Sequence, residues 1–270
     1  IFIYWDNGFS ESPDIVKKCL ISWKLKNLSW EIIELDNTNL KEYINIEQEI
    51  PAINQKNISW TSYSDIIRIF LLEKYGGCWC DATTFCVNSL DKWLEETLDN
   101  KSFFAFSNNP SKKEKDQKIL SSWFLYGEPR SYILKKWKQS VIDYWNNRII
   151  MDNYFWFHIL FYKLSKSDVS FKNIWSKTPK ISNKPSHFLK RKGLMSPITS
   201  EIKKHIKKHN TPIYKLTYKF SSKNNNYNYN NSILNYLLNT IQLRFIHIPK
   251  NGGSLIEEAA KKKDIKFGKY

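Results

Sequence analysis

The stretch SYSDIIRIFLLEKYGGCWCDATTFC, residues 62–86, decides the fold. Its first half repeats apolar residues at the spacing of an amphipathic helix, which we expect over residues 62–75. Gly76 and Gly77 can then supply the positive φ that ends a helix. The short apolar run after them predicts a strand that ends at Asp81. A helix that leads directly into a buried strand is typical of an α/β fold.

Three polar residues of this stretch are expected to act together. Asp65 and Arg68 are three positions apart, so they project from one face of the helix. Asp81 ends a strand, and ligands of open α/β sheets bind at the carboxyl ends of strands. The three side chains would suit a sugar nucleotide, because a cation neutralises a diphosphate while carboxylates hold hydroxyls or a divalent cation. The spacing also allows a simpler arrangement, with a surface ion pair and a turn aspartate.

The residues around this stretch extend the α/β pattern. Residues 1–5 and 30–36 are apolar enough for buried strands, and the segment between them has helical periodicity. Strand, helix and strand in this order indicate a parallel βαβ unit, so the N-terminal half is predicted to form a Rossmann-type nucleotide-binding layer. Further strands are expected over residues 102–107, 121–127 and 212–219, and further helices over 129–145 and 154–164.

Composition narrows the class of protein. The chain has 270 residues, 41% hydrophobic and 16% aromatic, which indicates a globular protein. Its net charge is +16, yet only 5 of the 42 basic residues are Arg. Because bidentate contacts to bases rely on Arg, we expect no sequence-specific nucleic-acid binding. The Lys excess favours either a solvated surface or phosphate-bearing ligands.

The four cysteines, Cys19, Cys78, Cys80 and Cys86, match no zinc-binding spacing. They are therefore expected to be buried free thiols of a reducing compartment. No segment has the roughly 20 apolar residues of a membrane span. The sequence thus predicts a soluble, cytoplasmic protein.

Several motifs carry a resemblance to a known family. The pattern Asp65-x-x-Arg68 followed by YGGCWCDAT, residues 75–83, resembles the core of the capsular polysaccharide synthesis glycosyltransferases. These are related to DxD-containing mannosyltransferases and to clostridial glucosylating toxins. The similarity continues through IYWDNGFSESPDIVKKC, SSWFLYGEPRSYIL, YFWFHILF and PIYKLTYK, and it covers nearly all of residues 1–220. It implies a GT-A fold, α/β with a mostly parallel central sheet flanked by helices.

The resemblance also implies roles for individual residues. Asp65 and Arg68 would hold the sugar and phosphate side of the donor, and Asp81 would be the first carboxylate of the DxD motif. Trp5 would lie near the nucleotide base, although an aromatic residue at a strand end is equally consistent with core packing. Ser122 would lie near the donor sugar.

Two further positions leave alternatives open. Thr83 stands where the DxD motif has its second carboxylate. A hydroxyl is a weaker, neutral ligand, so either Asp81 holds Mn²⁺ or Mg²⁺ with water and phosphates, or lysines neutralise the diphosphate. His158 matches a position near the acceptor cleft, but its aromatic helix also suits a core histidine.

The C-terminal part resembles another family. Residues 221–232 are rich in Asn and Ser and predict a linker. The pattern restarts at residue 233, and HIPKNGGS resembles the 5′-phosphosulfate loop of carbohydrate sulfotransferases. The resemblance implies an anion site at Lys250, Gly252, Gly253 and Ser254. Residues 233–270 would then be a partial sulfotransferase-like unit; alternatively, they dock on the first domain, the GT-A domain predicted for residues 1–220.

The function expected from these features is transfer of a sugar from a nucleotide-sugar donor, UDP-linked, to a glycan or glycoconjugate acceptor. The resemblance implies retention of the anomeric configuration. An alternative hypothesis is a catalytically silent module that binds polyanions or glycans, because the second DxD carboxylate is absent. A third is a fragment of a bifunctional glycosyltransferase–sulfotransferase.

Overall fold

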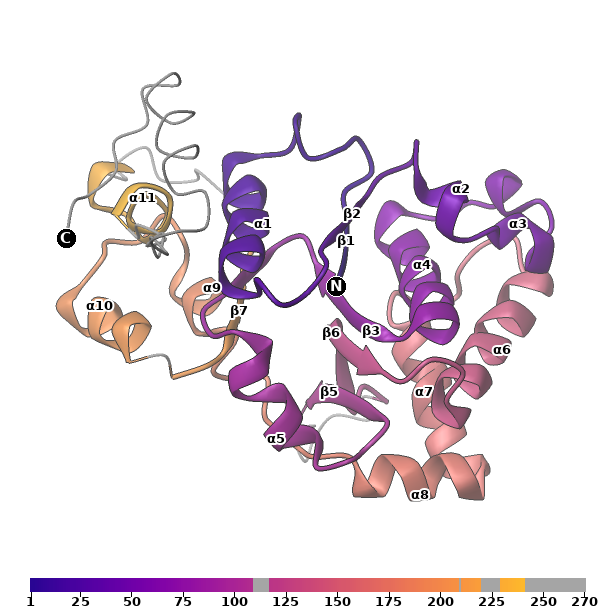
Figure 1. Ribbon diagram of the computed structural model, residues 1–270. Coiled ribbons are helices and arrows are strands. Elements are labelled where there is room, and N and C mark those ends of the chain that lie inside the picture. Colours follow the sequence, from indigo (N-terminus) through magenta and orange to yellow (C-terminus); the bar gives the residue numbers. More distant parts are fainter. Residues whose placement is uncertain (109–116, 209, 220–228, 241–270) are drawn as a thin grey trace, which may run out of the picture.

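The computed structural model describes residues 1–108, 117–208, 210–219 and 229–240 (Figure 1). At its centre is a five-stranded sheet with the strand order β2-β1-β3-β6-β5. Its strands, in chain order, are β1 (Phe2–Tyr4), β2 (Ile33–Leu35), β3 (Gly77–Asp81), β5 (Phe103–Ser107) and β6 (Leu120–Gly127). A second, two-stranded sheet pairs β4 (Thr84–Cys86) with β7 (Ile213–Lys215).

Strand directions confirm the predicted class. β1 pairs in parallel with both β2 and β3, whereas β6 is antiparallel to β3 and to β5. Four strands therefore run in one direction and β6 runs against them. The molecule is an α/β fold with a mostly parallel central sheet flanked by helices.

Each face of the sheet is covered by its own layer (Figure 1). One core cluster contains α2 (Leu40–Tyr43), α3 (Ile46–Glu49), a 3₁₀ turn (Ile53–Gln55), α4 (Trp60–Tyr75), α6 (Tyr132–Asn146), α7 (Trp156–Ser167) and α8 (Val169–Lys177). The other contains α1 (Asp14–Lys26), a 3₁₀ turn (Leu90–Lys92), α5 (Leu94–Leu98), α9 (Phe188–Lys192), α10 (Ser200–Lys207), α11 (Ile233–Asn235) and the small sheet.

β3 shows how the sequence divides between these layers. Successive side chains of a strand point to opposite faces. Trp79 accordingly packs with α4, while Cys78 and Cys80 pack on the α1 side. The four cysteines are free, buried thiols, as predicted, and burial raises the pKa of Cys78 and Cys86 to about 12.

The helix before β3 has well-defined ends. The Ser59 hydroxyl accepts a hydrogen bond from the Ser62 backbone N–H at 3.2 Å and caps α4 at its start. At the other end Gly76 has φ +69° and donates its N–H to Leu72 O at 2.9 Å. α4 thus begins two residues before the predicted start, at Trp60, and ends as predicted.

Other boundaries differ more from the predictions. α6 begins at Tyr132 instead of residue 129, because Pro129 and Arg130 form a turn in which Arg130 has φ +58°. β2 covers only Ile33–Leu35, and β7 only Ile213–Lys215, outside the central sheet.

The segment after the predicted linker packs against the first domain. It forms α11 and a π-helix (Tyr236–Thr240), and a 3₁₀ turn (Tyr229–Asn231) precedes it within the predicted linker. Ile233 and Leu237 are fully buried in the core cluster of α1, and Lys18 Nζ donates to Leu238 O at 3.0 Å. The predicted phosphosulfate-like loop, Lys250, Gly252, Gly253 and Ser254, lies outside the described residues, so the sulfotransferase resemblance stays a prediction. Within the described part of the chain, no helix has the length and apolar character needed to cross a bilayer.

Candidate active site

The candidate site lies where several strands end together. Tyr4 of β1 is in register with Leu35 of β2 and with Asp81 of β3, so the carboxyl ends of these strands are level. The antiparallel β6 begins at the same edge, because its Phe124 pairs with Cys80. Ligands bind at this edge in open α/β sheets.

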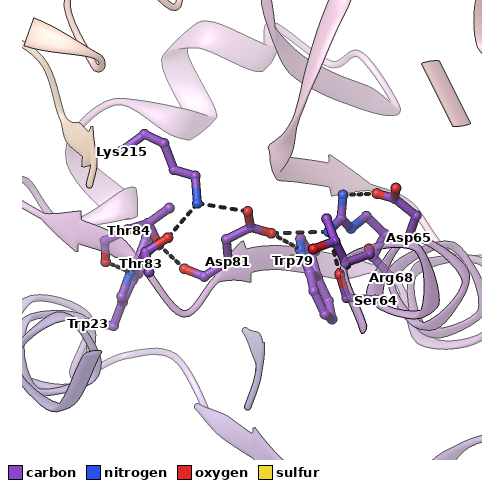
Figure 2. A network of polar contacts seen from close by, with 10 residues as sticks. Trp23, Ser64, Asp65, Arg68, Trp79, Asp81, Thr83, Thr84 and Lys215 are labelled. Carbon is purple, nitrogen blue, oxygen red and sulfur yellow. Dashed lines mark hydrogen bonds and ion pairs between the residues drawn. The ribbon is translucent and has the colours of Figure 1, made fainter. Parts of the chain in front are cut away.

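Asp65, Arg68 and Asp81 meet at this edge (Figure 2). Arg68 Nη1 forms a short ion pair with Asp65 Oδ1. Arg68 Nη2 lies 3.2 Å from Asp81 Oδ1 and donates to Ser64 Oγ at 3.1 Å. The side chains of Arg68 and Asp65 are only 3% and 8% exposed, so they do not form the surface ion pair of the simpler hypothesis. The sequence prediction that the three side chains converge is correct.

Aromatic residues hold this arginine in place. The guanidinium lies 5.0 Å from the Trp79 ring centroid and 5.8 Å from that of Phe157 on α7. The Trp79 indole N–H also donates to Asp81 Oδ1 at 3.0 Å. Within the described residues, Arg68 Nε is buried and has no hydrogen-bond partner. The Nε donor thus faces the protein interior, and the Arg68 side chain is only 3% exposed.

A second cation, Lys215, was missed by sequence reasoning. Its Nζ lies 2.9 Å from Asp81 Oδ2 and donates a hydrogen bond to Thr83 Oγ1 (Figure 2). Lys215 is the last residue of β7 and pairs with Thr84 of β4, while Leu216 N–H donates to Thr83 O at 2.8 Å. The only signal in the sequence was that Lys215 lies within the short strand predicted at residues 212–219, which also contains Lys219.

Hydrogen bonds from Thr84 and from Trp23 on α1 fix the turn that carries Asp81 and Thr83. Thr84 Oγ1 donates to Asp81 O at 2.6 Å. The indole N–H of Trp23 on α1 contacts both Thr84 O, at 2.9 Å, and Thr84 Oγ1, at 3.0 Å. Buried bonds of this kind hold Asp81 in one orientation before any ligand arrives.

The two carboxylates have opposite pKa shifts. Burial would raise the pKa of Asp81, but Lys215 and Arg68 outweigh burial and hold it below the ordinary value, so Asp81 is an anion. For Asp65, burial is the largest cause and raises the pKa to about 6 although Arg68 opposes it. Two anions and two cations thus balance at neutral pH.

Ser122 and His158 both lie close to this cluster. Ser122 is buried, and its side chain is close enough to Asp65 to lower the pKa of that carboxyl slightly against the effect of burial. His158, on α7, has a buried Nδ1 that lacks a partner among the described residues. Burial, followed by the charges of Arg68 and Lys118, lowers the pKa of His158 to about 3, so the ring is neutral.

Trp5 lies one strand away, directly after β1. It is half-buried and its ring meets that of Tyr218 edge to face, with centroids 5.1 Å apart. Trp5 packs against the core cluster of α1 and still reaches the edge of the sheet. The packing alternative for Trp5 is therefore confirmed, and its place near a nucleotide base stays a prediction.

The chain is similar to fungal enzymes with glycosyltransferase names. It is 24% identical to O-glycosyltransferase PaGT of Phomopsis amygdali over 56% of this chain and 40% of that protein. It is 26% identical to glycosyltransferase afumC of Aspergillus fumigatus over 54% of this chain and 40% of that protein. O-glycosyltransferase braB of Annulohypoxylon truncatum is 20% identical, over 54% and 37%. The chain thus spans less than half the length of these curated relatives.

The chain is also similar to a solved structure and to the model of one protein family. The solved structure named PaToxG Glycosyltransferase aligns with a TM-score of 0.42 and 15% identity, over 76% of this chain and 81% of that one. The family model described as capsular polysaccharide synthesis protein matches residues 1–237. With nearly all of its described residues inside this match, the chain belongs to the capsular polysaccharide synthesis protein family.

Proposed function

We propose that this chain is a glycosyltransferase that transfers a sugar from a nucleotide-sugar donor, UDP-linked, to a hydroxyl of a glycan or glycoconjugate. The family and the names of the relatives support the reaction class. The observation that carries the proposal is the position of Asp81, an anion at the carboxyl edge of the sheet between Arg68 and Lys215. Cationic side chains can bind the anionic phosphates of the donor, and a carboxylate can accept hydrogen bonds from its sugar hydroxyls.

The proposed roles follow from charge. The acceptor oxygen bonds to the anomeric carbon, the bond from that carbon to the diphosphate oxygen breaks, and the acceptor hydroxyl loses its proton. Negative charge grows on the diphosphate during this step, and Arg68 is placed to stabilise it. Asp81 accepts hydrogen bonds from the sugar, and Asp65 keeps Arg68 oriented. For the proposed retention, the acceptor attacks from the face of the leaving diphosphate, whose oxygen takes the proton.

The test is thermal stability in the presence of UDP, GDP and CMP, with and without Mn²⁺. A ligand that binds the folded state raises the melting temperature. We expect a nucleoside diphosphate to stabilise the wild-type chain and to lose most of its effect in Asp81→Asn. Asp99→Asn is the matched control, because the Asp99 side chain is 80% exposed and its φ of +43° suits Asn.

One result would overturn this proposal. If no nucleotide stabilises the wild type while heparin binds and is released as salt rises, the chain is the polyanion-binding module of the alternative hypothesis. The net charge of +16 makes that measurement a necessary companion to the nucleotide series.

A further inference from the structure

The charges around Asp81 do not suit a divalent cation. Mg²⁺ and Mn²⁺ prefer several oxygen ligands that are free to coordinate. Asp81 Oδ1 accepts from Arg68 and Trp79, and its Oδ2 is paired with Lys215. Within the described residues, no group of three or more His, Cys, Asp or Glu side chains could hold a metal. A metal ion bound to Asp81 would therefore lie beside two fixed positive charges.

The position of Thr83 is a second reason why a divalent cation does not suit this site. Its hydroxyl oxygen stands at the position of the second DxD carboxylate and accepts a hydrogen bond from Lys215. The lysine thus occupies the space between the two side chains that would otherwise clamp a cation (Figure 2). Asp65 cannot complete a metal site either, because the Arg68 guanidinium bridges it to Asp81.

The Lys215 ammonium is accessible to an anionic ligand. Its side chain is 15% exposed, so it reaches the surface of the site. An ammonium has three donors, of which Asp81 and Thr83 engage two. The backbone around it is fixed, since Lys215 N–H donates to Ser186 O at 2.9 Å and β7 pairs with β4. A lysine held this way loses little freedom when it binds a ligand.

We propose that the Lys215 ammonium takes the place of a divalent cation and binds the donor diphosphate directly, so that nucleotide binding at this site needs no metal ion. This inference rests on the glycosyltransferase function proposed above. Lys215 and Arg68 approach Asp81 from opposite sides, through Oδ2 and Oδ1 respectively. A diphosphate above Asp81 would contact the partly exposed Lys215 and lie close to the positive charge of the more deeply buried Arg68.

The test compares UDP and GDP with their nucleosides, uridine and guanosine, by titration calorimetry in EDTA and in Mn²⁺. The wild-type chain is expected to bind one of the two diphosphates with the same affinity in EDTA and in Mn²⁺. Lys215→Met should weaken that diphosphate by about 10- to 100-fold, which is the effect of one hydrogen bond to a charged group. The matching nucleoside should be unaffected, because Lys215 contacts only the diphosphate. Lys215→Arg keeps the charge and should retain most of the affinity.

The control is Lys207→Met, which removes one exposed lysine from α10 and should leave diphosphate affinity unchanged. Diphosphate binding that requires Mn²⁺ and survives Lys215→Met would overturn this inference while leaving the proposed function intact. Absence of diphosphate binding with and without Mn²⁺ would overturn both. Equal loss of nucleoside and diphosphate in Lys215→Met, with Lys215→Arg no better, would show that Lys215 only supports the fold.

Discussion

Asp65 and Asp81 share one arginine and yet differ in the direction of their pKa shifts. Asp65 is almost fully buried and, among the described residues, forms an ion pair with Arg68 alone, so burial dominates and raises its pKa to about 6. The Asp81 side chain is 25% exposed and has two close cations, Lys215 and Arg68, so its pKa falls. Asp81 is the permanent anion of the site, whereas Asp65 titrates near neutrality.

This difference predicts how stability depends on pH. Between the unfolded pKa of Asp, about 4, and the folded pKa of about 6, folded Asp65 holds a proton that the unfolded chain has released. Raising the pH through this window therefore lowers the free energy of unfolding of the wild type relative to Asp65→Asn, by roughly 1–3 kcal/mol. The lowered pKa of Asp81 makes the free energy of unfolding rise with pH, but only below the unfolded pKa of Asp, which is outside this window.

Urea denaturation at about pH 4.5 and about pH 7 measures most of this change, because the two values lie on either side of the folded pKa. Asp99→Asn controls for the loss of a carboxylate elsewhere. An unfolding free-energy difference between wild type and Asp65→Asn that stays constant with pH would contradict the raised pKa.

Among the elements, the connection from α4 to β3 joins the helix that carries Asp65 and Arg68 to the strand that ends at Asp81. Gly76 and Gly77 both have positive φ, +69° and +81°. A Cβ on Gly76 would lie 2.5 Å from Pro129 Cδ and 2.8 Å from Pro129 N, whereas one on Gly77 would meet nothing within 4 Å. The two glycines are thus required for different reasons, close packing at Gly76 and backbone conformation at both.

Gly76→Ala is expected to destabilise the protein more than Gly77→Ala. An alanine at positive φ costs roughly 1–2 kcal/mol, and at Gly76 the collision with Pro129 adds to it. Chemical denaturation of the two variants measures the difference directly. Equal losses would mean that the turn around Pro129 shifts to accommodate the added methyl group, and would contradict the close-packing role of Gly76.

Local patterns predicted α4, β3 and the meeting of Asp65, Arg68 and Asp81, because helix spacing and strand ends are set by nearby residues. Lys215 could not be predicted this way, since it reaches Thr83 from 132 positions away. Its place depends on the pairing of β4 with β7, which no periodicity reveals. The late start of α6 was missed for a related reason, because Arg130 adopts an unusual φ for a residue with a side chain.

Considered as a whole, the molecule has two core clusters separated by the central sheet, and the segment after the predicted linker belongs to one of them. Ile233 and Leu237 are fully buried there, and Lys18 of α1 holds Leu238 O. The family match also extends to residue 237. Residues 229–238 therefore contribute to the stability of the first domain.

Leu237→Ala tests this contribution. Truncating a fully buried leucine lowers the free energy of unfolding by about 2–5 kcal/mol. If this segment unfolds together with the first domain, the single cooperative unfolding transition should shift to lower stability as a whole. Leu238→Ala, at a partly buried neighbouring position, is the matched control and should cost less. If Leu237→Ala leaves the main unfolding transition unchanged, the segment belongs to a separate unit, as the sequence-based boundary at residue 233 predicts.

The buried thiols offer a direct measure of how the sheet moves. Cys78 and Cys80 lie in β3, next to Asp81, and Cys86 lies in β4. Only an exposed thiolate is alkylated readily, so reaction under native conditions has to wait for the surrounding strands to separate. The alkylation rate of these cysteines therefore reports how often β3 and β4 open, and a ligand bound between Arg68 and Lys215 would lower that rate.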